Sequence, residues 1–194
     1  IFDLDVDEES LGGTLSYSNP NYDFTGNSVN YSISSTKNDK PDQGYENSII
    51  SAGVGTSFEQ YKDVRTSLGL NASYDDLRSQ SNASDAIKKQ SGKYNDITLN
   101  YGFSQDKRNR SFMPTSGSII SFNQSLPLYA DKPALGNVLS SSIYKTLSED
   151  VVGAGKFYMA SINGLDDDVR LSNRTSLSSK RLRGFERGKV GPMD

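Results

Sequence analysis

The sequence predicts an all-β protein in which about eight antiparallel strands follow one another along the chain as a meander. Apolar and polar residues alternate with a period of two through much of its 194 residues, a pattern typical of strands with one apolar and one polar face. No apolar run approaches the roughly 18–20 residues of a membrane-spanning helix. Several alternating stretches still reach the roughly 9–11 residues that a tilted membrane strand needs, so a transmembrane β-barrel and a soluble β-sandwich both remain open.

The strands can be placed in order along the chain. A short one is expected at residues 11–18, and a clear one at 25–35, where Val29, Tyr31 and Ile33 alternate with polar neighbours. Equally clear alternation marks residues 48–58, 64–74 and 95–104, and less regular alternation marks 118–128, 137–147 and 151–162. This order of strands without helices between them predicts antiparallel pairing.

The connections favour the barrel over the sandwich. We expect them at 19–26, 37–47, 59–63, 76–93, 106–117, 129–136 and 148–150, and much of this series alternates between long and short. Barrels of bacterial outer membranes have long loops on one membrane face and short turns on the other. Aromatic residues near strand ends fit an interfacial girdle, although they also fit the core of a sandwich; they are Tyr31, Tyr74, Tyr101 and Phe103.

Composition narrows the possible chemistry. The chain has no cysteine and no histidine, which removes thiolate metal sites, the usual zinc sites and the most frequent general base. A net charge of −3 argues against a nucleic-acid partner. The acidic residues between Asp3 and Glu9 lack the spacing and the glycine of a calcium loop, and we interpret them as a solvated strand edge. We therefore expect no enzyme, no metal and no cofactor.

A charged turn precedes the strand at 118–128. Its proline and glycine predict a turn before the new strand begins, although the connection at 106–117 is longer than the other connections expected on its side of the sheet. The order of residues resembles a turn of the BamA-type outer-membrane assembly family, in which a related segment opens a strand midway through the barrel. The matching residues are Asp106, Arg108, Asn109, Phe112, Pro114, Thr115 and Gly117.

Two more segments carry the same resemblance. The stretch containing Arg183, Gly184 and Phe185 is similar to the Arg-Gly-(Phe/Tyr) motif at the tip of the family's sixth external loop, and residues 188–192 resemble the family's residues just after that motif. The segment at 17–29 resembles the family's Asn-Pro turn between two early strands. Without these other segments, the basic residues around Arg183 would be interpreted as a solvated loop.

The resemblance implies a fold for the whole chain. Residues 1–194 would be part of a sixteen-stranded transmembrane barrel, with strands over about 10–163 and the sixth external loop over about 164–194. The POTRA domains of the family would lie outside this chain, as would the first and last barrel strands. Arg183 would contact the inner barrel wall, with its partner in a strand beyond Asp194.

The resemblance also implies a function. The protein would fold and insert β-barrel clients in the outer membrane of a Gram-negative bacterium, with unfolded clients, accessory lipoproteins and the lipid bilayer as partners. A two-partner secretion translocator or a TamA-like relative, which share the loop motif, is the alternative. A soluble β-sandwich adhesin domain is the third possibility, and it predicts a core that needs no lipid.

Overall fold

The structure, a computed structural model, describes residues 1–7, 10–41, 44–166 and 168–174. This part of the chain forms nine strands, a short helix α1 (Asp85–Lys88) and one 3-10 turn, η1 (Leu171–Asn173). The strands are β1 (Phe2–Asp7), β2 (Ser10–Tyr22), β3 (Asn27–Lys40), β4 (Tyr45–Tyr61), β5 (Val64–Ser79), β6 (Gly92–Asp106), β7 (Gly117–Ala130), β8 (Ala134–Ser148) and β9 (Val151–Gly164).

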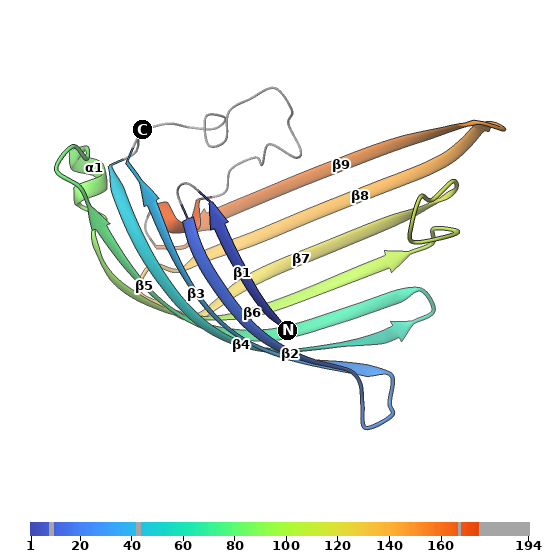
Figure 1. The fold of residues 1–194 in the computed structure, drawn as a ribbon, viewed down its shortest axis with the longest axis horizontal. Helices are drawn as coiled ribbons and strands as arrows, with labels where there is room; N and C mark the ends of the chain where they lie inside the picture. Colours follow the sequence, from blue (N-terminus) through green and yellow to red (C-terminus); the bar gives the residue numbers. More distant parts are fainter. Residues whose placement is uncertain (8–9, 42–43, 167, 175–194) are drawn as a thin grey trace.

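The nine strands form one antiparallel sheet in which every strand pairs with its neighbours in sequence. The spatial order is β1 through β9 without a crossover, so the predicted meander is confirmed. The sheet curves into an open trough whose edges within the described part are β1 and β9 (Figure 1). Strands β2 to β9 contain 13 to 17 residues each, enough for a tilted strand to cross a bilayer.

All eight expected strands are present, with two differences from the expected pattern. The acidic N-terminal stretch forms an additional strand, β1, which pairs with β2 from Phe2 opposite Leu15 to Asp7 opposite Ser10. The expected long connection at 37–47 is wrong, because β3 continues to Lys40 and β4 begins at Tyr45. Polar residues at 37–40 and 46–48 pair across the two strands, and this pairing accounts for an extension that hydrophobic alternation does not predict.

The two faces of the sheet differ in polarity, as the alternation predicted. Leu70 stands between Val54 and Leu99 in the cross-strand register, on an apolar face. Its neighbour Asn71 stands between Gly53 and Thr98 on the opposite face, which is concave and lined mainly by polar residues. A one-residue change in register would exchange the two faces.

The two rims of the trough carry different connections. One rim holds the connection that contains α1 and the end of β9, and the other holds the turn between β6 and β7 (Figure 1). Long connections therefore occur at both rims, rather than at one alone. None of the described helices is long and apolar enough to cross a membrane.

Candidate functional site

A small cluster of buried apolar residues lies at the rim that carries α1. It consists of Tyr45, Leu77, Ala83, Ile87 and Tyr94, with Leu171 packed against it. Local sequence explains how the connection folds over the strands: the Ser84 hydroxyl accepts a hydrogen bond from the Ile87 amide and caps the helix. The cluster brings residues from β4, β5, β6 and the connection containing α1 together with the segment after β9.

An ion cluster lies beside these apolar residues on the concave face. Asp75 of β5 pairs with Tyr94, and Asp96 of β6 pairs with Ser73, so the two carboxylates are near neighbours on one face. The guanidinium of Arg170 contacts both of them: its Nε lies 3.4 Å from the Asp75 carboxylate, and its Nη2 donates a hydrogen bond to Asp96. All three residues are buried, with exposed fractions of 1% for Asp75, 3% for Arg170 and 7% for Asp96.

Further contacts fix the geometry of this arginine. Its guanidinium carbon lies 4.6 Å from the ring centroid of Tyr94, a cation–π arrangement. The Arg170 Nε also donates to the Ser172 hydroxyl at 2.8 Å, and that hydroxyl donates to the Asp75 carboxylate at 2.5 Å. Arginine suits this position because its planar group can engage two carboxylates and an aromatic face at once.

The backbone after β9 is held at the same place. The amide of Leu171 donates to the side-chain oxygen of Gln90 at 3.0 Å, and the hydroxyl of Tyr94 donates to the carbonyl of Gln90 at 2.5 Å. Residues from β5, β6, the α1 connection and the η1 segment thus meet in one buried cluster. We call it the Arg170 clasp, made of Asp75, Gln90, Tyr94, Asp96, Arg170, Leu171 and Ser172.

The chemistry available in the Arg170 clasp is electrostatic. One guanidinium faces two carboxylates, and the Ser172 hydroxyl donates a hydrogen bond to one of them, that of Asp75. Charges removed from water require partners of opposite sign to remain charged, so the clasp holds together only while Arg170 is present. This arrangement binds one segment of the chain to another.

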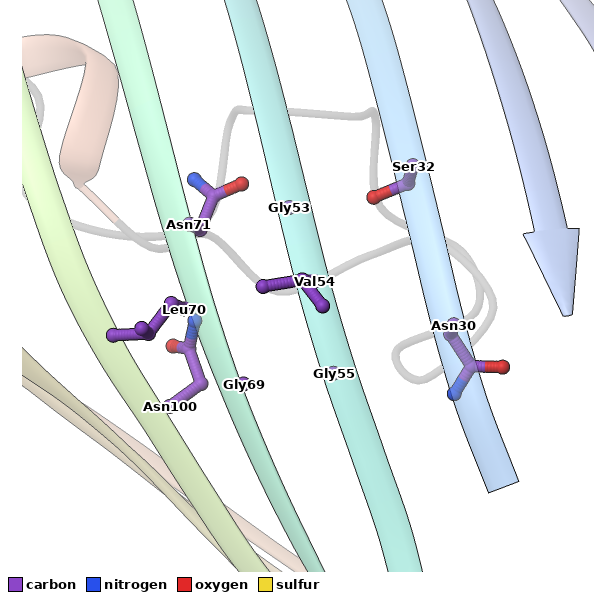
Figure 2. Close-up of a pocket in the computed structure, with 9 residues that line it drawn as sticks. All are labelled: Asn30, Ser32, Gly53, Val54, Gly55, Gly69, Leu70, Asn71 and Asn100. Atoms are coloured by element: carbon purple, nitrogen blue, oxygen red, sulfur yellow. The ribbon is translucent and has the colours of Figure 1, made fainter. Parts of the chain in front are cut away.

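A shallow hollow of about 270 Å³ lies in the concave face over β3 to β6. Figure 2 shows its floor, where Gly53, Gly55 and Gly69 leave the backbone uncovered, and its borders, which include Asn71 and Asn100. Gly55 and Gly69 are directly opposite each other on β4 and β5. A Cβ atom at Gly55 would lie 3.3 Å from the Leu68 carbonyl oxygen, so glycine permits the close approach of the two strands there.

The charged connection at the other rim forms the turn that its proline and glycine predict. Arg108 donates to both carboxylate oxygens of Asp106, at 2.9 and 2.6 Å, and this contact raises the pKa of the Arg108 guanidinium. The Asn109 side chain accepts from the amides of Thr115 and Ser116 and donates to the Thr115 hydroxyl. Strand β7 then begins at Gly117, as expected from the sequence.

Backbone conformation explains the glycine of this turn. Gly117 has a φ of +96°, and a Cβ atom there would lie 2.1 Å from the Lys107 carbonyl oxygen. Phe112 is exposed, at 80%, and Pro114 and Thr115 lie in the connection before the strand. These residues are therefore brought together as a structural turn, at the rim opposite the Arg170 clasp (Figure 1).

The predicted loop motif and the observed clasp are different sites. Arg183, Gly184 and Phe185 lie outside the described residues. Sequence reasoning missed Arg170, Asp75 and Asp96. A signal was available for the acids, since Asp96 continues the polar face of its strand through Thr98 and Asn100. After β9 the chain returns to β5 and β6, and this return brings Arg170 to the two acids. The alternation of apolar and polar residues does not indicate such a return.

Long strands with one apolar face, curved around a polar concave face, define this sheet as a segment of a transmembrane β-barrel. The family model for the Omp85 superfamily domain matches residues 2–194, and the chain belongs to that superfamily. Its members are outer-membrane β-barrel proteins that act as insertases or translocators.

A solved structure shows the same fold. It is titled as BamA from Haemophilus ducreyi lacking POTRA domains 1–3, and it is similar to this chain with a TM-score of 0.74 and 21% sequence identity. The match covers 85% of this chain and 35% of that one, so the chain spans about a third of the BamA chain. The nine-stranded open sheet thus matches part of a BamA barrel.

Proposed function

We propose that the protein to which this chain belongs folds and inserts β-barrel clients in the outer membrane. The observation that carries the proposal is the Omp85 match over residues 2–194, together with the segment Arg183, Gly184 and Phe185 that this match includes. Residues 1–194 would supply part of the barrel wall and, from about 164 onward, most of its sixth external loop. Unfolded outer-membrane proteins, accessory lipoproteins and the bilayer would be the partners.

The physical basis is the need of a client strand for backbone partners in lipid. An unpaired N–H or C=O group is costly in the hydrocarbon region, and an open strand edge in the insertase can supply partners while the client folds. The loop with Arg183 would hold the barrel in the conformation that exposes this edge, and local thinning of the bilayer would ease insertion. Neither a metal nor a cofactor takes part in this mechanism.

The test uses the full-length protein in its own cell. Arg183→Ala is compared with Arg187→Ala, a matched change in the same loop, at equal expression. We expect several unrelated porins to lose their heat-modifiable, folded form in the first variant and to keep it in the second. Both variants should themselves reach the outer membrane.

A second candidate is a translocator of the same superfamily, which would export one substrate. Normal porin folding in the Arg183→Ala cell, with loss of a single exported protein, would replace the insertase proposal by this one. The charged turn at 106–117 and the long connection around α1 favour the insertase slightly, because both features resemble the assembly family.

A further inference from the structure

The segment after β9 connects the edge of the described sheet with the Arg170 clasp. Strand β9 ends at Gly164, while the partners of Arg170 lie on β5 and β6, four and three strands away. With neighbouring strands about 4.8 Å apart, this is about 14–19 Å along the sheet. Six residues reach about 20 Å at most, so the stretch 165–170 is just long enough to span this distance.

The sheet itself does not need the clasp in order to pair at this point. Strands β5 and β6 are already joined by a continuous register from Val64 opposite Gln105 to Leu77 opposite Gly92. What the clasp determines instead is where the segment after β9 lies relative to β5 and β6. Buried ion clusters contribute little net stability compared with apolar packing, and the location that they specify can be their main effect.

We propose that Arg170 is a positioning residue, which fixes the start of the segment leading to Arg183 against the inner face of the barrel wall at β5 and β6. The inference rests on the proposed function, because it concerns the loop that carries Arg183, Gly184 and Phe185. Asp75 and Asp96 orient the guanidinium, and Leu171 inserts into the apolar cluster beside it.

The clasp changes where the segment leading to the loop motif begins. Arg183 lies 19 positions after Gly164, the end of β9, and 13 positions after Arg170. With Arg170 held in the clasp, this segment starts from β5 and β6 instead of β9.

The first test measures whether the segment is held. Leu171→Cys is introduced in the full-length protein in the outer membrane; residues 1–194 contain no other cysteine. The rate at which a membrane-impermeant maleimide labels this cysteine is then measured. Adding Arg170→Gln should raise the labelling rate at least about tenfold, because removing one partner of a buried ion cluster releases the others. Adding Arg78→Gln, which removes an exposed ion pair on β5, should leave the rate unchanged.

The second test separates positioning from general stability by a double-mutant cycle. Porin folding is measured for Arg170→Gln, Arg183→Ala and the double variant, at equal amounts of the heat-modifiable, folded protein. Residues that act through one another give non-additive effects, so the double variant should be no worse than Arg183→Ala alone. Arg170→Lys, which keeps the charge without the planar fork, replaces Arg170→Gln if the latter does not fold, and it should restore porin folding only in part.

The outcomes distinguish this inference from the proposed function. Unchanged labelling in a folded Arg170→Gln protein, or porin defects that multiply in the double variant, would overturn the positioning role and leave the insertase proposal intact. Normal porin folding in Arg183→Ala would overturn the insertase proposal, and the labelling rate at position 171 would then decide alone whether Arg170 holds the segment.

Discussion

Arg170 donates a hydrogen bond to the carboxylate of Asp96, a residue 74 positions earlier in the chain, and both side chains are buried. A second carboxylate, that of Asp75, contacts the same guanidinium. One positive charge therefore compensates two negative charges in a site largely closed to water. The three residues should respond very unequally to substitution.

We expect Arg170→Gln to lower the free energy of unfolding by about 3–5 kcal/mol, because it leaves two buried carboxylates without their cation. Asp96→Asn should cost much less, about 1 kcal/mol, since Arg170 and Asp75 then remain as a balanced pair. Urea unfolding of the full-length protein in detergent micelles, followed by the loss of heat-modifiable mobility, measures both. Equal losses in the two variants would contradict this account of the charges.

Gly117→Ala should destabilise the turn between β6 and β7 by about 1–3 kcal/mol, because a Cβ atom there meets the Lys107 carbonyl oxygen and φ is positive. Gly13→Ala on β2 is the matched control, since nothing lies within 4 Å of a Cβ atom at that position. The urea midpoint of each variant checks the difference. A midpoint for Gly117→Ala as high as that for Gly13→Ala would show that the turn rearranges freely.

Asn109→Ala removes the oxygen that accepts from the Thr115 and Ser116 amides. Because both amides lie in an exposed turn where water can replace the lost acceptor, we expect a loss of about 1 kcal/mol. Asn109→Asp keeps the accepting oxygen and serves as the control, with a smaller loss. Unfolding curves of the two variants should therefore separate, and coincident curves would argue against a role for that oxygen.

The two faces of β5 can be compared at adjacent positions. Leu70→Arg places a charge on the apolar face near the middle of the strand, where lipid contact should make it cost about 2–4 kcal/mol. Asn71→Arg points to the polar concave face and should cost less. Folding yield into lipid vesicles measures the pair, and the reverse order would mean that the faces are assigned to the wrong environments.

The strands were predictable because each places apolar residues on one face and polar residues on the other, and a period of two records that fact directly in the sequence. Val29, Tyr31 and Ile33 mark the first half of β3 in this way. The ends of strands were less predictable: residues 37–40 pair with β4 but carry polar side chains, so they give no apolar signal. The N-terminal strand β1 does show alternation, in Phe2, Leu4 and Val6, but its acidic residues favour a solvated edge, and its full pairing with β2 is not evident from them.

The site was predictable only where it is local. Asp106, Asn109 and Gly117 belong to one turn, and their spacing is enough to indicate it. The clasp depends on where the chain goes after Gly164, and no residue near Arg170 indicates that it turns back to β5 and β6. In the sequence, an arginine beside polar residues looks the same whether it lies in a solvated loop or in a buried ion cluster. Only the path of the chain in three dimensions distinguishes these two environments.

The meander has a consequence for the order in which the protein forms. Each strand from β2 to β9 pairs with the strand made just before it, so the sheet can be extended hairpin by hairpin, and each step closes a short loop. Arg170 follows β7, β8 and β9 in the chain, and its contact with Asp96 joins residues 74 positions apart. Because closing so long a loop before the intervening strands pair costs more entropy, we expect this contact to form late in folding, when this part of the wall is complete.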